Sequence, residues 1–174
     1  MQIGPYQTVR ELGRGGMGVV YEARDPSGRR VALKVLLDSE LSGGEGLLRF
    51  REEVRACADL AHPNLVRYVG SGITPRGQPY LAMDFLEGPT LAERVKQQGP
   101  YEPEQAALLI ADLASALTHA HRRGVLHRDL KPDNVVLVEG RPVLVDFGLA
   151  RVGGRERERL THTGELLGTP AYMT

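Results

Sequence analysis

A cluster of glycines near the amino terminus is the feature that most restricts what this chain can fold into. Four of the six residues in Gly13–Gly18 are glycine. The flanking segments Gln7–Leu12 and Val19–Ala23 predict short strands, and a third strand is predicted at Arg30–Leu36 after a turn at residues 25–28. A dinucleotide-binding unit would have a helix directly after such glycines. The strand that follows them here favours another fold.

One helix and two further strands are predicted in the next part of the chain. The helix covers Leu47–Ala61, is ended by the proline at position 63, and has one apolar stripe, made of Leu47, Phe50, Val54, Cys57 and Ala61. The strands are expected at Leu65–Val69 and Pro79–Phe85, separated by a turn at residues 74–77. The first part of the chain is therefore predicted to be a five-stranded unit with one helix, ending near Phe85.

The rest of the chain is predicted to be mostly helical. Thr90–Glu93 has the sequence of a capping box at the start of a short helix. A longer helix is expected over Pro103–Arg123 and capped by Gly124, with an apolar stripe at Ala106, Ile110, Leu113, Leu117 and Ala120. Two short strands follow at Val135–Val138 and Val143–Val145. The mixture predicts an α+β fold.

Composition and charge exclude several kinds of protein. The 22 basic and 22 acidic residues cancel, so no overall field attracts nucleic acid or an anionic membrane. The single cysteine, Cys57, allows no disulfide within the chain and fits a reducing compartment. Residues 1–10 do not resemble a signal peptide, and no apolar run is long enough to span a bilayer. We therefore expect neither a nucleic-acid partner nor a membrane segment.

The glycine cluster also matches a motif with a chemical purpose. The segment Gly13–Val20 fits the pattern G-x-G-x-x-G-x-V. Glycine allows backbone N–H groups to approach a phosphate with no Cβ in the way. The alternative interpretation is a glycine-rich hairpin turn with no ligand.

A lysine within an apolar strand is the second candidate. Lys34 follows Val31, Ala32 and Leu33, and a buried ammonium group needs a carboxylate or phosphate partner. Glu53 on the predicted helix could supply that carboxylate. The alternative is a lysine that extends along the protein to a strand edge, with its charge in water.

The densest group of polar side chains lies at His127–Asn134, between a predicted helix and a predicted strand. Asp129 can accept a hydroxyl proton, Lys131 can neutralise a phosphate, and Asn134 can offer an oxygen to magnesium. A polar turn without function gives no reason for this spacing. Farther along, Asp146 and the glycine at position 148 follow an apolar strand, which suits a hard cation but is also common in ordinary turns.

Taken together and in this order, these motifs closely resemble the protein kinase family. The residues Lys131-Pro132 resemble its serine/threonine branch, and the segments Leu48–His62 and Gly168–Met173 resemble the bacterial kinases of eukaryotic type. The resemblance covers essentially the whole chain. It implies the bilobal kinase fold, with residues 1–86 as the ATP-binding lobe and 87–174 as part of the second lobe.

The resemblance implies ATP and Mg²⁺ as cofactors and assigns residues to the nucleotide. Met83 resembles the gatekeeper, residues 84–86 the hinge that reads adenine, and Glu53 is chosen over Glu52 by its spacing from the residues Leu60 and His62. The complete set implied for the nucleotide is Leu12, Gly13, Gly15, Gly18, Val20, Ala32, Lys34, Glu53, Met83, Asp84 and Leu86.

The same resemblance implies the catalytic and metal-binding roles. Asp129 would orient and deprotonate the substrate hydroxyl, and Lys131 would steady the transferred group. Asn134 and Asp146 would hold magnesium. Arg128 is typical of kinases that respond to phosphorylation in the activation segment, and the candidate sites there are Thr161 and Thr163, which could equally be ordinary loop threonines, while Thr169 would lie near the substrate.

Other residues have plain structural interpretations. Cys57 is predicted to lie in the core, His62 to be a turn residue, and Tyr68, Tyr80 and Phe85 to pack within strands. The histidines His119, His121 and His162 show no spacing typical of a zinc site.

The last feature of the sequence is where the resemblance stops. The family continues with Ala-Pro-Glu after a segment like 168–173, whereas this chain ends at Thr174. We therefore expect a catalytic-domain fragment of low activity and marginal stability that exposes apolar area on the helix at residues 106–120.

Three functions remain open on these grounds. The first is transfer of phosphate from ATP to serine or threonine of a protein, and the second is a nucleotide-binding or scaffolding role without transfer. The third is a small-molecule phosphotransferase, which usually lacks counterparts of Arg128 and Lys131-Pro132. We expect a cytoplasmic location, alone or as part of a longer membrane-anchored protein.

Overall fold

The computed structural model describes residues 1–15, 18–37 and 44–147, and these form two compact units. The first unit contains Met1–Ala58 and Arg67–Phe85. The second contains Asp59–Val66 and the described residues from Leu86 onward. Residues 59–66 thus pack with the second unit, although they lie inside the range 1–86 that the sequence assigns to the first lobe.

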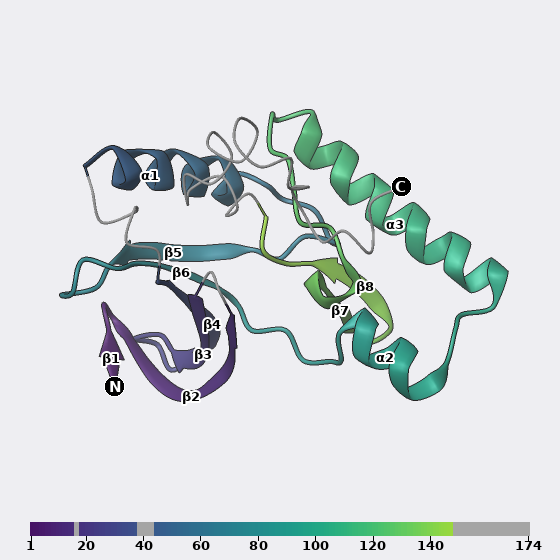
Figure 1. Ribbon diagram of the computed structural model, residues 1–174, viewed down its shortest axis with the longest axis horizontal. Helices are drawn as coiled ribbons and strands as arrows, with labels where there is room; N and C mark the ends of the chain where they lie inside the picture. Colours follow the sequence, from purple (N-terminus) through teal and green to yellow (C-terminus); the bar gives the residue numbers. More distant parts are fainter. Residues whose placement is uncertain (16–17, 38–43, 148–174) are drawn as a thin grey trace, which may run out of the picture. The chain divides into compact units, whose positions relative to one another are not determined.

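The first unit is built on one antiparallel sheet, whose first four strands curl tightly in Figure 1. It has six strands in the order β1-β2-β3-β4-β6-β5. Their bounds are Gln2–Ile3 for β1, Tyr6–Gly15 for β2, Gly18–Arg24 for β3, Arg30–Leu36 for β4, Tyr68–Ile73 for β5 and Pro79–Asp84 for β6. The prediction of five strands was wrong by one, because the two-residue β1 is too short to give a pattern.

Two strands of this sheet begin or end elsewhere than expected. Strand β2 continues to Gly15, into the glycine cluster, because it pairs with β3 as far as Gly18. Strand β5 begins at Tyr68 rather than at Leu65. Leu65 instead donates its N–H to the carbonyl of His62 and bridges to Leu144 in the second unit. The limit of β2 is therefore set by its pairing with the neighbouring strand, whereas the start of β5 is shifted because Leu65 bridges to the distant Leu144.

Both predicted turns of the first unit are confirmed. In the turn at residues 25–28, Gly28 donates its N–H to the carbonyl of Asp25 at 2.9 Å and has φ +87°. In the turn at residues 74–77, Gly77 donates to the carbonyl of Thr74 at 2.9 Å and has φ +79°. Glycine adopts these left-handed conformations without the steric penalty of a Cβ.

Strand alternation gives the sheet two chemically different faces. One face forms the core of the unit and contains Ile3, Tyr6, Ala23, Val31, Leu33, Val35, Tyr80 and Ala82. Tyr6 and Tyr80 meet edge to face with ring centroids 6.0 Å apart, which is a favourable geometry for aromatic pairs. Because side chains of a strand point alternately to the two faces, Ala32 and Lys34 of β4 lie on the opposite face.

Helix α1, Gly44–Ala58, completes the first unit and packs against β5 and β6 (Figure 1). Phe50, Val54 and Cys57 are buried as the apolar stripe predicts. The burial of Cys57 confirms the prediction of a core cysteine, and it raises the pKa of the thiol to about 12, with a further contribution from the charge of Glu53. The helix ends at Ala58 and not at Ala61, because the residues after it join the second unit.

Within its described residues, the second unit has two α-helices, a short 3-10 helix and a hairpin. Helix α2 covers Leu91–Gln98 and begins with the predicted capping box at Thr90. Helix α3, Pro103–His121, packs against β8. The hairpin of β7, Val135–Val138, and β8, Arg141–Leu144, turns through Glu139 and Gly140, both with positive φ, as a two-residue hairpin requires.

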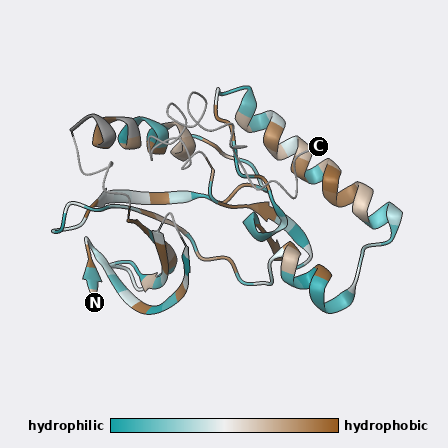
Figure 2. Ribbon diagram, in the orientation of Figure 1, coloured by the Kyte–Doolittle hydropathy of each residue, from teal (hydrophilic) through white to brown (hydrophobic). Residues whose placement is uncertain are grey.

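The apolar stripe of α3 is shifted from the predicted positions. The buried residues are Leu109, Leu113, Ala116 and Ala120, whereas Ile110 is 60% exposed. Leu109 and Ile110 fit the helical period equally well, so only the position of the neighbouring hairpin decides between them. Apolar residues recur along α3 in Figure 2, and Leu108 and Ile110 leave part of that area exposed, as expected. Among the residues described, no helix has the length and apolar character needed to cross a membrane.

Candidate active site

The glycine cluster forms the end of the β2–β3 hairpin, where Gly15 pairs with Gly18. A Cβ at Gly18 would collide with the carbonyl oxygen of Val35, so the fold itself requires glycine there. Gly13 and Gly15 differ, because a Cβ at either would meet no atom within 4 Å and neither has a left-handed backbone. The packing of the hairpin therefore explains why position 18 is glycine. It gives no structural reason for glycine at positions 13 and 15.

Lys34 lies on a central strand of the sheet. Strand β4 runs between β3 and β6, and Lys34 pairs with Val20 on one side and Leu81 on the other. The residue is only 7% exposed. This position excludes the alternative of a lysine at a sheet edge. Ala32, on the same face of β4, pairs directly with Met83.

The predicted partner of Lys34 can be judged by burial. On α1, Glu53 is partly buried and Glu52 is exposed. Since only a side chain turned towards the protein can meet a buried ammonium group, burial favours the choice of Glu53. Leu12 of β2 and Val20 of β3 keep some exposed surface, so this part of the hairpin retains apolar area that a ligand could cover.

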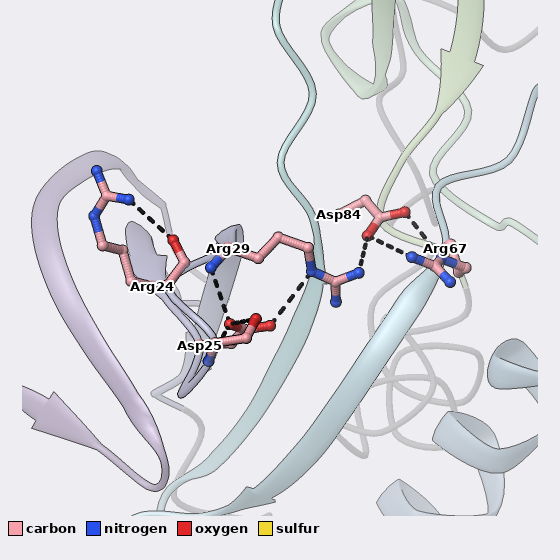
Figure 3. Close-up of polar contacts among 7 residues, drawn as sticks. Arg24, Asp25, Arg29, Arg67 and Asp84 are labelled. Carbon is pink, nitrogen blue, oxygen red and sulfur yellow. Dashed lines mark hydrogen bonds and ion pairs between the residues drawn. The ribbon is translucent and has the colours of Figure 1, made fainter.

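The predicted hinge begins at the end of β6. Met83 is buried, and Asp84 donates its backbone N–H to the carbonyl of Arg67 at 2.9 Å. The carboxylate of Asp84 also accepts two hydrogen bonds from the guanidinium of Arg67, at 3.0 and 3.2 Å, as Figure 3 shows. The backbone N–H of Asp84 is therefore used inside the first unit. Leu86, half-buried, is the first residue of the following part of the second unit.

In the second unit, three predicted catalytic side chains meet. The Lys131 Nζ lies 2.8 Å from Asp129 Oδ2. The side-chain amide nitrogen of Asn134 donates to the carbonyl oxygen of Asp129 at 2.8 Å and to its Oδ2 at 3.2 Å. Asn134 is buried, at the end of the short 3-10 helix η2, Pro132–Asn134. The structure thus brings Asp129, Lys131 and Asn134 into one hydrogen-bonded group.

Oxygen atoms of Asn134 and Asp146 are suitable ligands for a magnesium ion. Because Nδ2 of Asn134 is bonded to Asp129, the amide oxygen is the atom left to accept a cation. Asp146 follows Val145, whose N–H donates to the carbonyl of Asn134 at 3.0 Å. The backbone therefore ties these two candidate ligands together, and oxygen ligands of this kind suit a hard cation.

The loops that carry these residues contain strained backbone. Arg128 has φ +67° and Asp146 has φ +63°, values that are uncommon for residues other than glycine. Such conformations persist where the surrounding structure enforces them, and they occur often at functional sites. Arg128 adjoins the proposed catalytic residue Asp129, and Asp146 is itself a proposed magnesium ligand.

His127 connects these two loops. Its ring is buried, donates from Nε2 to the carbonyl oxygen of Val145 at 2.9 Å, and meets the ring of Phe147 with centroids 4.6 Å apart. Burial lowers the pKa of His127, although the bond to Val145 and the charges of Asp146 and Asp129 oppose this effect. A neutral ring therefore holds the backbone on which Asp146 lies.

Asn64 is a second supporting residue, and no motif in the sequence marks it as one. Its side chain donates to the carbonyl of Pro142 at 2.7 Å, and its own carbonyl accepts the N–H of Leu144 at 2.8 Å. Together with Val66, which donates to the carbonyl of Leu144 at 2.9 Å, it fixes strand β8 just before Asp146. The only signal in the sequence was a polar residue between two predicted elements.

A recess of about 430 Å³ lies elsewhere on the first unit. Its lining includes Val19, Tyr21 and Val35, which lie on the core face of the sheet, together with Arg14 and Arg76. None of the residues predicted for the nucleotide lines it. This recess is therefore separate from the candidate site.

Several predicted features lie outside the described residues. They are the glycine at position 148, the candidate phosphorylation sites Thr161 and Thr163, the segment 168–173 with Thr169, and His162.

Comparison with known proteins agrees with the geometry of both units. The protein kinase domain profile matches residues 6–174. The chain is 40% identical to the serine/threonine-protein kinase AfsK of Streptomyces griseus, over 99% of this chain and 21% of AfsK. It is 39% identical to the serine/threonine-protein kinase PknD of Mycobacterium tuberculosis, over 99% of this chain and 26% of PknD. The chain thus spans about a fifth to a quarter of the length of these relatives.

A solved structure gives the same result for the fold. The crystal structure of the Mycobacterium tuberculosis PknI kinase domain matches with a TM-score of 0.77 and 34% identity, over 86% of this chain and 60% of the other. The α+β, bilobal kinase fold predicted from the sequence is confirmed. The chain belongs to the protein kinase family, in its bacterial serine/threonine branch.

Proposed function

We propose that this chain binds ATP with Mg²⁺ and transfers the terminal phosphoryl group to serine or threonine hydroxyls of a protein. The observation that carries the proposal is the hydrogen-bonded group of Asp129, Lys131 and Asn134. It places a proton acceptor, a cation and an amide oxygen within one loop, which are the parts that phosphoryl transfer needs.

Each residue of this group has a separate task. The carboxylate of Asp129 orients the substrate hydroxyl and takes its proton as the oxygen forms the new bond to phosphorus and ADP leaves. Lys131, already 2.8 Å from Asp129 Oδ2, neutralises charge on the transferred group. Asn134 and Asp146 would hold Mg²⁺, which neutralises phosphate charge when bound.

On the first unit, the proposed nucleotide residues Val20, Ala32, Lys34 and Met83 share the face of the sheet opposite the core. The side chains proposed to surround the adenine are Leu12, Val20, Ala32 and Met83, and the backbone of residues 84–86 would recognise its polar edge. Lys34 would bind the phosphates and be positioned by Glu53. Gly13 and Gly15, which the fold does not require to be glycine, would let the backbone approach the phosphates together with Gly18.

The test compares two identical substitutions in the same loop. Asp129→Asn should reduce phosphate transfer from ATP to a generic protein substrate by about 10²- to 10⁴-fold, since it removes the proton acceptor. Binding of ATP–Mg²⁺, measured by displacement of a fluorescent nucleotide, should persist. Asp133→Asn is the control, because Asp133 is an exposed carboxylate only four residues away, and it should leave transfer unchanged.

The outcomes separate this function from its alternative. If the wild-type chain binds ATP–Mg²⁺ but transfers no phosphate, a nucleotide-binding or scaffolding role is favoured and transfer by this chain is contradicted. If it transfers phosphate to small molecules but not to protein, the proposed substrate class is wrong. Transfer that survives Asp129→Asn would contradict the role of Asp129.

A further inference from the structure

A buried carboxylate flanked by two arginines lies on the face of the sheet opposite the core, which carries Ala32 and Lys34 and is called the nucleotide face below. Glu22 of β3 is 7% exposed and pairs in the sheet with Ala32. Its Oε2 accepts from Arg10 Nε and its Oε1 from Arg30 Nε, each at 2.9 Å. Burial acts to raise the pKa of Glu22, but the two guanidinium groups outweigh it and the pKa is lowered. Glu22 therefore remains ionised and anchors both arginines.

The two arginines differ in one contact. The guanidinium carbon of Arg30 lies over the ring of Phe85, 4.0 Å from its centroid, whereas Arg10 has no such aromatic contact within the described residues. A guanidinium group at this distance is attracted to an aromatic face. Phe85 is the last residue of the first unit before the chain continues as Leu86.

The residue before Phe85 is anchored from the other face. Asp84 pairs with Val31 and so belongs to the core face, where its carboxylate bonds to Arg67 and lies 3.8 Å from Arg29 Nη1 (Figure 3). Arg29 is itself 3.4 Å from Asp25. Two successive residues are thus held by arginines, Asp84 on the core face and Phe85 on the nucleotide face.

We propose that Arg30 is a positioning residue for the nucleotide, acting through Phe85. This inference rests on the proposed function, in which the backbone of residues 84–86 recognises adenine. Arg30 donates a hydrogen bond from Nε to Glu22 and, at the same time, places the plane of its guanidinium group over the ring of Phe85. A lysine offers a point charge without that plane. The buried Glu22 fixes Arg30, Arg30 fixes the ring of Phe85, and the ring fixes the peptide groups of the hinge.

The experiment compares Arg30→Ala with Arg10→Ala. Both substitutions remove one 2.9 Å partner of the same buried carboxylate, so they should lower stability to a similar extent. Only Arg30→Ala should weaken binding of ATP–Mg²⁺, by about 3- to 30-fold. In phosphate transfer, the KM for ATP should rise while kcat stays near the wild-type value. Arg30→Lys, which keeps the charge beside Glu22, should behave like Arg30→Ala for nucleotide binding.

Amide hydrogen exchange at residues 84–88 gives a second measurement that needs no nucleotide. Exchange there should be faster in Arg30→Ala, in Arg30→Lys and in Phe85→Leu, which removes the ring but leaves the Arg30–Glu22 pair. It should not change in Arg10→Ala. The double variant Arg30→Ala/Phe85→Leu should exchange no faster than either single variant, because both remove the same contact.

The results distinguish this inference from the proposed function. Equal effects of Arg10→Ala and Arg30→Ala on nucleotide affinity and on exchange would overturn the positioning role and leave a purely structural one. If the wild-type chain binds no nucleotide, the proposed function fails and with it the nucleotide role of Arg30. In that case, faster exchange confined to Arg30 and Phe85 variants would still show that Arg30 holds the hinge.

Discussion

The two units hold their proposed site residues by different means. In the first unit, Ala32, Lys34 and Met83 lie on regular strands, and backbone pairing with strand alternation decides where each side chain points. In the second unit, Asp129 and Asp146 lie in loops, and side chains from other segments hold the backbone that carries them. A sheet face is therefore assembled by repetition, whereas the loop site is assembled by individual contacts.

This difference has a consequence for mutation. On the sheet, shortening one side chain leaves the pairing of its neighbours intact, because the backbone hydrogen bonds do not depend on that side chain. In the loops, Asn134, His127 and Asn64 each bond to backbone groups of other residues. Removing one of them leaves a buried acceptor unsatisfied and releases the segment it held. The loop site should therefore be sensitive to residues that never touch a substrate.

The largest effect on stability is expected from a substitution in helix α3, which supports the hairpin strand that leads to Asp146. Helix α3 packs against β8, and Leu113 on that helix is 7% exposed, whereas Leu108 is 71% exposed. Leu113→Ala should lower the free energy of unfolding by about 2–5 kcal/mol, because it leaves a cavity in a packed interior. Urea denaturation measures this change, and amide exchange of β8 should become faster.

The matched control is Leu108→Ala on the same helix. It should change the free energy of unfolding by no more than about 0.5 kcal/mol, because the side chain is on the surface. Equal effects of the two substitutions would mean that the buried stripe of α3 has been placed wrongly, and that the loop does not depend on this helix.

A smaller effect is expected within the glycine hairpin of the sheet. Gly18→Ala should destabilise the protein by about 1–3 kcal/mol, because its Cβ would collide with the backbone of Val35. Gly15→Ala should leave stability unchanged, because its Cβ meets no atom within 4 Å, but should weaken ATP–Mg²⁺ binding. Thermal unfolding and nucleotide titration of both variants separate the two roles. Loss of stability in Gly15→Ala would show that the fold requires that glycine as well.

The smallest expected effect is on the pH dependence of stability, which His127 in the loop site should influence and Glu22 on the sheet should not. Because burial lowers the pKa of His127, the unfolded chain binds more protons than the folded chain between that value and the ordinary pKa of about 6.5. Stability should therefore fall as the pH drops below about 6.5. His127→Gln keeps a donor for Val145 without titrating, and should reduce the slope by at most about 1.4 kcal/mol per pH unit.

The remaining slope has an identifiable source. The pKa of His119 is also lowered, mainly by burial and by Arg123. His119 therefore also makes stability fall at low pH, in the wild type and in His127→Gln alike. Denaturation at pH 5 to 8 provides the comparison. On the sheet, Glu22 remains ionised over this range because its pKa is lowered. A pH profile unchanged by His127→Gln would contradict the account of His127 as a buried neutral group.

The sequence by itself determined the family, the order of most elements and the candidate site residues. The strand at Arg30–Leu36 and the strand at Val135–Val138 have the predicted bounds. The capping box at Thr90 could be recognised in the sequence because its hydrogen bonds join residues three apart. These features depend on local spacing, which a sequence states directly. The proposed catalytic residues could be recognised for the same reason, since their motif is a short run of polar side chains.

Only the tertiary structure decided the features that depend on distant segments. These are the end of α1 at Ala58, the start of β5 at Tyr68, the choice of Leu109 over Ile110 on α3, and the contacts that Asn64 and Arg30 make. In each case the local pattern allows more than one answer with similar energy. A hydrogen bond or a packing contact to a residue far along the chain selects one of them, and such a partner is not visible in the spacing of neighbouring residues.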